Sequence, residues 1–319
     1  MGKHSLFLTL VVASSATAGE PEMKKTTHTY KTVGPTKIQA DVYRSASKEA
    51  RPVLVWIHGG ALIVGSRQSV PKNLLDLARK EDYVLVSIDY RLAPEAKLPA
   101  IADDVADALR WIRKEGPKLF RANPDKMVIS GGSAGGYLTL LAGTRVEPRP
   151  RGLVAYWGYG DVDGDWYTKP SDWYRTKVPL ASRDEALKAI SSAVLTETPP
   201  GAPEGKTRGR LYHYYRQNGL WTKEVTGFDP ATERAKLDPY CPVRVVPADY
   251  PPTIMIHGTN DDDVPYEQSA AMARVLKEKG LPHELVTVEG AGHGLAGGDA
   301  KQVNAAHAKA LEFIRDRLK

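Results

Sequence analysis

Cysteine is almost absent from this sequence: Cys241 is the single one among 319 residues. One thiol cannot form an intrachain disulfide, so the fold must be held by its hydrophobic core alone. No cysteine follows the N-terminal apolar run, which argues against a lipoprotein anchor. Cys241 also lacks the sequence context of a cysteine protease, and we interpret it as a structural residue.

Long blocks of one charge are also missing. The 44 Lys and Arg residues exceed the 38 Asp and Glu residues by six, but they are dispersed along the chain. This distribution is typical of a solvated surface rather than of a nucleic-acid footprint, so we expect no nucleic-acid partner. The composition, 42% hydrophobic and 26% charged, is that of an ordinary globular protein.

The apolar run near the N-terminus is short. Lys3 and His4 precede apolar residues 6–13, and residues 16–18 then read Ala-Thr-Ala. This layout predicts a secretory signal peptide over residues 1–18, and a secreted or periplasmic protein with no stable membrane anchor. The alternative is a disordered or interfacial N-terminus.

Short apolar runs alternate with segments of helical periodicity over most of the chain. Such alternation predicts an α/β fold, with a mostly parallel sheet covered by helices on both faces. Residues 27–32 and 37–43 alternate polar and apolar side chains, as an antiparallel pair at a sheet edge does. We expect further strands at 53–57, 83–88, 126–130, 152–156, 253–256 and 284–288, and helices at 73–80, around 101–112, at 266–279 and at 303–317.

Residues 157–250 do not follow this alternation. They are rich in Trp, Tyr, Pro and Gly, and the run 199–203 should break any helix. We predict an insertion that forms a cap over the active site; a surface excursion without a catalytic role is the alternative. Trp166 and Tyr167 are candidates for substrate binding in it, although packing of the insertion onto the body explains them nearly as well.

The most informative motif is Gly-Gly-Ser-Ala-Gly over residues 131–135, between an apolar run and a helical segment. A serine on a tight strand-to-helix turn needs glycine on both sides, because a Cβ there would collide with the neighbouring elements. The turn exposes the Ser133 hydroxyl and leaves the Ala134 N–H free to donate to an oxyanion. Ser133 is therefore a candidate nucleophile.

A serine hydroxyl needs a positioned base, and the base needs a carboxylate. His293 lies in a glycine-rich loop directly after the last predicted strand, and Asp261 begins a run of three aspartates after the preceding strand. A second oxyanion donor should come from His-Gly-Gly-Ala at residues 58–61, where Gly60 and Ala61 follow a central strand.

Together with residues 89–95 (Asp-Tyr-Arg-Leu-Ala-Pro-Glu), these motifs resemble the α/β-hydrolase superfamily, in particular its hormone-sensitive-lipase-like and acetyl-esterase branch. Feruloyl-esterase-like members are equally similar. The resemblance covers the chain from about residue 53 to the C-terminus, apart from the insertion. It implies Ser133 as nucleophile, His293 as base and Asp261 as acid, with an oxyanion hole from the N–H groups of Gly60, Ala61 and Ala134.

Two positions depart from that family pattern. Gly132 stands where the lipase branch usually has an acidic residue, and Ala61 stands where it usually has glycine. Neither departure removes a member of the triad or a donor. Both leave the substrate class open, including acyl length.

We therefore expect residues 19–319 to form a serine hydrolase domain that cleaves small acyl, acetyl or feruloyl esters, either small molecules or carbohydrate-linked. No cofactor is expected, and no metal, because the aspartates at 161–165 fail the calcium-loop pattern. One alternative is a prolyl-oligopeptidase-like peptidase; the segment before residue 53 is short for that family's propeller. The other is a non-catalytic ligand-binding protein on a hydrolase fold.

Overall fold

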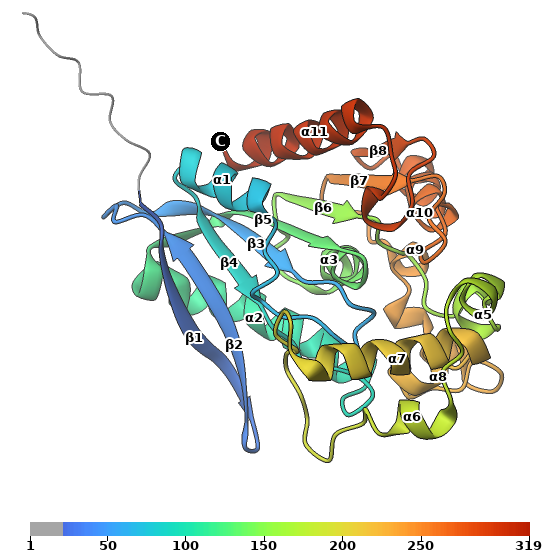
Figure 1. Ribbon diagram of the computed structural model, residues 1–319. Helices are drawn as coiled ribbons and strands as arrows, with labels where there is room; N and C mark the ends of the chain where they lie inside the picture. The colour runs from blue at the N-terminus through green and yellow to red at the C-terminus, as the bar shows by residue number, and fades with distance from the viewer. Residues whose placement is uncertain (1–21) are drawn as a thin grey trace, which may run out of the picture.

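The computed structural model describes residues 22–319 of the chain (Figure 1). The signal peptide predicted over residues 1–18 lies outside the described residues. Eight strands form one sheet in the order β1-β2-β4-β3-β5-β6-β7-β8. The strands are β1 (Lys24–Val33), β2 (Thr36–Arg44), β3 (Arg51–Ile57), β4 (Val84–Ile88), β5 (Ala122–Gly132), β6 (Gly152–Tyr156), β7 (Thr253–Gly258) and β8 (His283–Val288).

The sheet is parallel from β4 to β8, whereas β1 and β2 form an antiparallel hairpin that adds to β4 at one edge. Every residue of β4 and β6 is buried, because helices cover both faces of the central strands. The exposed pattern of β1 agrees with its place at the edge. The mostly parallel sheet predicted from the sequence is confirmed.

Helices cover the two faces of this sheet. On one face, α1 (Lys72–Lys80) and α11 (Ala300–Leu318) pack against β3, β4, β6 and β7 through one apolar cluster. On the other, a larger cluster unites α2 (Leu98–Phe120), α3 (Ala134–Arg145) and α10 (Glu267–Glu278) with the insertion. No helix within residues 22–319 is both long enough and apolar enough to cross a membrane.

The segment between β6 and β7 is more helical than its composition indicated. It contains α4 (Asp165–Thr168), α5 (Asp172–Lys177), α6 (Arg183–Leu187), α7 (Pro203–Asn218), α8 (Trp221–Thr226) and α9 (Pro242–Val245). The last proline of the run 199–203 is the first residue of α7. Proline is accepted at this position because the N–H that it lacks would have no partner within the helix. In Figure 1, α7 lies beside α6 and α8, and α8 also contacts α2.

Candidate active site

Ser133 occupies the turn between β5 and α3. Its backbone has φ 56° and ψ −122°, a strained conformation for a residue with a side chain. The turn is tight: a Cβ on Gly131 would lie 2.3 Å from the Gly135 carbonyl oxygen, and one on Gly135 would lie 2.0 Å from that of Ile57. These glycines therefore allow the close approach that leaves the serine hydroxyl exposed at the end of the strand.

The three residues predicted to form a triad meet at this point. His293 follows β8, and its Nε2 lies 3.1 Å from the Ser133 Oγ. Its Nδ1 lies 2.8 Å from Oδ2 of Asp261, which follows β7. When Nδ1–H donates to Asp261, Nε2 is free to accept the serine proton. A continuous path of hydrogen bonds thus joins residues separated by 160 and 32 positions.

Asp261 is held in the ionised form. Burial alone would raise the pKa of its carboxyl group, but hydrogen bonds from His257 and His293 outweigh burial and lower that pKa to about 2. Oδ1 also accepts from the backbone N–H of Val264 at 2.8 Å. The carboxylate is therefore fixed in position and charged at neutral pH.

The imidazole of His293 responds to two opposing effects. Burial lowers the pKa of its ring, while the hydrogen bond to Asp261 and the charges of Asp263 and Asp261 raise it. The hydrogen bond and the charges together outweigh burial, so the pKa of His293 lies above its usual value of 6.5. The surroundings of the ring therefore favour its protonated, imidazolium form.

Asp263 was not predicted to contribute, yet its Oδ2 lies 3.6 Å from His293 Nε2. Its other oxygen accepts from Tyr174 at 2.9 Å, from Tyr212 at 2.5 Å and from Arg216 at 2.7 Å. The sequence signal was the run of three aspartates, of which only the first matched the family pattern. The structure places both the first and the third beside the imidazole.

The expected oxyanion donors lie on two neighbouring turns. Gly60 has φ 107°, and a Cβ there would meet the Val64 carbonyl oxygen at 2.2 Å. Ala61 has φ 55°, which costs a residue with a side chain about 1 kcal/mol or more. Within residues 22–319, no hydrogen bond uses the N–H groups of Gly60, Ala61 or Ala134, so they remain available to an oxygen of a substrate.

His58 stabilises this loop through contacts of its imidazole ring. Its ring stacks on Tyr90 with 4.3 Å between centroids, and Nδ1–H donates to the Gly59 carbonyl at 2.8 Å. Burial lowers the pKa of His58 to about 4. The ring is therefore neutral at physiological pH and has a structural role.

The insertion fastens the same loop from the other side. Trp221 Nε1–H donates to the Ala61 carbonyl at 3.1 Å, and Arg208 Nε–H donates to the Ile63 carbonyl at 2.8 Å. Arg208 also forms an ion pair with Glu95 at 2.8 Å, with both side chains almost fully buried. The insertion thus positions the loop that carries Gly60 and Ala61.

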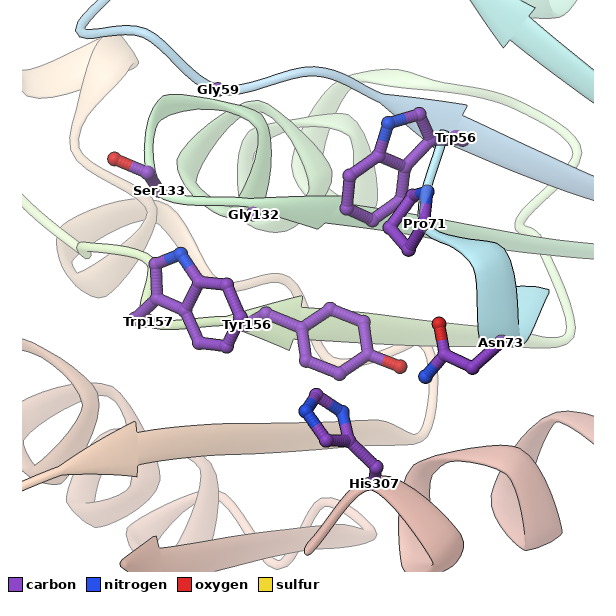
Figure 2. Close-up of a pocket in the computed structure, with 9 residues that line it drawn as sticks. All are labelled: Trp56, Gly59, Pro71, Asn73, Gly132, Ser133, Tyr156, Trp157 and His307. Carbon is purple, nitrogen blue, oxygen red and sulfur yellow. The ribbon is translucent and has the colours of Figure 1, made fainter. Parts of the chain in front are cut away.

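A cavity of about 220 Å³ opens beside Ser133 (Figure 2). Four of its nine lining residues carry aromatic rings, and it extends toward α1 and α11. It is lined by Trp56, Gly59, Pro71, Asn73, Gly132, Ser133, Tyr156, Trp157 and His307. Tyr156 ends β6 and Trp157 follows it, at the edge where parallel strands gather functional residues, a rule that could have indicated both from the sequence.

Trp166 and Tyr167, the expected substrate-binding residues, do not line this cavity. Tyr167 is buried in an aromatic stack, 3.8 Å from the Trp221 ring and 3.5 Å from the Trp166 ring. The guanidinium of Arg216 lies 5.0 Å from the Tyr167 ring. Packing of the insertion onto the body, the alternative considered from sequence, accounts for both residues.

The aspartates of the insertion are engaged by protein donors. Asp161 accepts from the Gly164 N–H at 2.9 Å and from Trp166 Nε1–H at 3.1 Å. Asp163 forms an ion pair with Arg244. In the part of the chain that the structure describes, no three His, Cys, Asp or Glu side chains form a group able to hold a metal ion.

Two family models each match part of the chain. The BD-FAE family model matches residues 40–156, which contain Gly60 and Ser133. The prolyl oligopeptidase family model matches residues 207–319, which contain Asp261 and His293. The solved structure of an alpha/beta hydrolase superfamily protein from Enterococcus faecalis aligns with 92% of this chain and 99% of its own, with a TM-score of 0.71 and 20% identity. The chain has the α/β-hydrolase fold.

Two further proteins are similar to this chain. Thermogutta terrifontis esterase 2, solved after phosphoramylation by tabun, aligns with 96% of this chain and 97% of its own, with a TM-score of 0.61 and 21% identity. Non-reducing polyketide synthase atr1 from Stereocaulon alpinum is 26% identical over 88% of this chain. The chain spans only 13% of the length of that synthase.

Proposed function

We propose that this protein hydrolyses carboxylic esters through an acyl-enzyme formed on Ser133. The observation that carries the proposal is the hydrogen-bond path from the Ser133 hydroxyl through His293 to Asp261. A hydroxyl, an imidazole and a carboxylate in this order convert an unreactive alcohol into a nucleophile.

In the first half of the reaction, Ser133 Oγ attacks the ester carbonyl carbon while its proton passes to His293 Nε2. The carbonyl oxygen becomes an oxyanion and accepts from the N–H groups of Ala134, Gly60 and Ala61. Each such donor contributes about 3 kcal/mol to lowering the barrier. The proton on Nε2 then passes to the departing alkoxide, and the alcohol leaves.

In the second half, a water molecule attacks the acyl carbon and gives its proton to His293. The oxyanion forms again against the same N–H groups. When it collapses, the bond to Ser133 breaks, the serine takes back its proton and the carboxylic acid is released. Asp261 keeps its charge throughout and holds the imidazole in the required tautomer.

The known relatives support this chemistry in a general way. The Thermogutta protein is named an esterase, and a phosphorus electrophile reacts with it, as expected of an enzyme with an activated nucleophile. The N-terminal sequence supports the further proposal that the protein is exported as residues 19–319. Small-molecule or carbohydrate-linked esters, with acetyl or feruloyl groups among them, remain the proposed substrates.

The test is labelling and turnover. A fluorophosphonate probe should label the wild-type protein, and mass spectrometry should place the adduct on Ser133. Ser133→Ala should abolish both labelling and hydrolysis of an ester panel from acetate to long-chain acyl and feruloyl groups, with an unchanged circular dichroism spectrum. Near-full activity of Ser133→Ala would refute the mechanism.

Peptide hydrolysis is the second candidate, because the prolyl oligopeptidase model matches the region that contains Asp261 and His293. The same triad can cleave an amide if the leaving amine is protonated. Side-by-side assays with prolyl amides and acetyl esters separate the two. A kcat/KM for the amides above that for the esters would assign the protein as a peptidase. A ligand-binding protein without catalysis would be neither labelled nor active.

A further inference from the structure

Asp263 connects the insertion to the catalytic histidine. One of its oxygens, Oδ1, accepts hydrogen bonds from the hydroxyls of Tyr174 and Tyr212 and from the guanidinium of Arg216, at 2.5–2.9 Å. Tyr174 lies in α5, and the other two donors lie in α7. The second oxygen, Oδ2, accepts no hydrogen bond in the described part of the chain and lies 3.6 Å from His293 Nε2. The insertion therefore holds one end of the carboxylate, and the other end faces the base.

The three donors fix Asp263 in place. The Arg216 side chain is only 3% exposed, and its guanidinium lies 4.8 Å from the Tyr174 ring and 5.7 Å from the Tyr212 ring. Nη1 of Arg216 also donates to the backbone carbonyl of Asp263 at 2.9 Å. A planar guanidinium beside aromatic rings is preorganised to bind a carboxylate. The clamp on Asp263 thus consists of Tyr174, Tyr212 and Arg216.

The distance between Asp263 and the imidazole has two consequences. At 3.6 Å from Nε2, the Oδ2 atom is too far for a normal hydrogen bond, whereas Ser133 Oγ, at 3.1 Å from the same nitrogen, is within reach. The Coulomb energy falls only with the first power of the distance, so the carboxylate still acts on a charge at Nε2. Asp263 is therefore near enough to stabilise the imidazolium, but it does not replace Ser133 as the partner of Nε2.

The charged groups that face the imidazole come from two elements. Asp261 pairs with Nδ1 and Asp263 lies beside Nε2, both from the loop after β7, whereas Arg216 belongs to α7. Burial and the charge of Arg216 lower the pKa of His293. The hydrogen bond to Asp261 and the charges of both aspartates raise it. The balance at the base therefore depends on a carboxylate that the insertion holds.

We propose that the clamp gives the insertion a role in catalysis, by holding Asp263 where its charge stabilises the imidazolium of His293 without accepting the proton on Nε2. The three clamp residues are positioning residues, because they act through Asp263. The imidazolium forms when Ser133 attacks and again when water attacks, so the carboxylate assists both halves of the reaction. The inference rests on the proposed function, since the imidazolium forms in that catalytic cycle.

The first test removes the two hydroxyls of the clamp. The double variant Tyr174→Phe with Tyr212→Phe keeps both rings and the ion pair between Arg216 and Asp263. The carboxylate is then free to turn and to accept the Nε2–H of the imidazolium. The acidic limb of the kcat/KM profile should move to higher pH, because the ring holds its proton more tightly. The plateau of kcat should fall by roughly fivefold, the effect of one net hydrogen bond, because the proton is directed away from the departing alkoxide.

The second test repeats this change in an Asp263→Asn background. Without a charge at this position, the acidic limb should lie at lower pH than in the wild type, and removing the two hydroxyls should move it little further. A clamp that only anchors the insertion would give the same change in both backgrounds. That result would overturn the inference, and so would an unmoved limb in the first test. If Asp263→Asn does not fold, because it leaves the buried Arg216 without its anion, the first test decides alone.

Two matched controls separate the clamp from general effects. Tyr215→Phe also removes a buried tyrosine hydroxyl from α7, but this hydroxyl has no hydrogen-bond partner among the described residues. Asp262→Asn removes the same charge from the exposed side chain next to Asp263. Both controls should keep the wild-type limb and kcat. Equal displacement of the limb in Asp262→Asn and Asp263→Asn would show a general effect of charge and overturn the inference.

An NMR titration of the resting protein removes the dependence on turnover. The chain has eight histidines, and His293→Gln assigns the imidazole signal of interest. The pKa of His293 should be higher than in the wild type when the two clamp hydroxyls are removed, and lower in Asp263→Asn. Equal values in all three proteins would overturn the inference. Hydrolysis of 4-nitrophenyl acetate by the wild type tests the proposed function separately: without it the function fails, whereas turnover with equal pKa values removes only the role of the clamp.

Discussion

The buried ion pair between Arg208 and Glu95 offers a direct test of how the insertion supports the active site. The side chains are 1% and 5% exposed. Arg208 also donates to three carbonyl groups, those of Ile63, Ala93 and Ala189. Arg208→Met keeps much of the side-chain volume but removes the charge and every donor. It leaves the Glu95 carboxylate buried without its cation.

Removing one partner of a buried ion pair costs about 3–5 kcal/mol. The entropy of unfolding is about 2.1 cal/mol/K per residue, or roughly 0.6 kcal/mol/K for a chain of this size, so Arg208→Met should melt roughly 5–8 °C below the wild type. Because Arg208 holds the Ile63 carbonyl next to the oxyanion loop, kcat for ester hydrolysis should fall as well. A displacement of the loop that takes one oxyanion donor out of reach should reduce kcat by about a hundredfold.

Differential scanning calorimetry measures the first effect and steady-state kinetics the second. Arg210→Met is the control, since Arg210 lies on the same helix and pairs with Glu185 at the surface, 43% and 53% exposed. Such exposed pairs contribute about 1 kcal/mol or less. The double variant Glu95→Gln with Arg208→Met should recover part of the stability. Equal melting temperatures for Arg208→Met and Arg210→Met would refute the reasoning.

Three other outcomes follow from the geometry. Activity should rise with pH through the pKa of His293, since only the neutral ring is a base; Asp263→Asn removes a negative charge beside that ring, lowers its pKa and should move the acidic limb of the kcat/KM profile to lower pH. An unmoved limb would contradict this. Gly135→Ala places a Cβ 2.0 Å from a backbone carbonyl and should prevent stable folding, whereas Gly205→Ala, with open space around it, should melt at or above the wild-type temperature; equal melting curves would show the turn to be loose. Cys241 is buried, and burial raises the pKa of its thiol to about 12, so a thiol reagent such as DTNB should react only after unfolding in guanidinium.

The sheet and the convergence of Ser133, His293 and Asp261 could be predicted because their signals are local. Strands covered on both faces must be apolar throughout, and the run at 53–57 coincides with the C-terminal part of β3. The turn around Ser133 needs glycines at fixed positions, so its geometry appears directly in the sequence. His293 follows the same logic, as a residue in a glycine-rich loop after a strand.

The insertion and the cavity could not be predicted in the same way. Arg208 and Glu95 form an ion pair although 113 positions separate them in the sequence, and no local motif of either residue predicts the other as its partner. Asn73 and His307 come from helices that pack on the same face of the sheet, so their approach to Tyr156 depends on tertiary packing. The composition indicated an irregular insertion, because the contacts that fold it into six α-helices, five of them short, leave no local signal in the sequence.

The bonds from Trp221 and Arg208 to the loop around Ala61 have a consequence for protein engineering. Exchanging such an insertion between related proteins is one way to change substrate selectivity. In this protein a foreign insertion would remove the hydrogen bonds that hold the strained backbone turn at Ala61. A working chimera would need side chains in the foreign insertion that donate as Trp221 and Arg208 do, together with their partners at positions 61, 63 and 95. The insertion and this loop are therefore expected to be inherited as one unit.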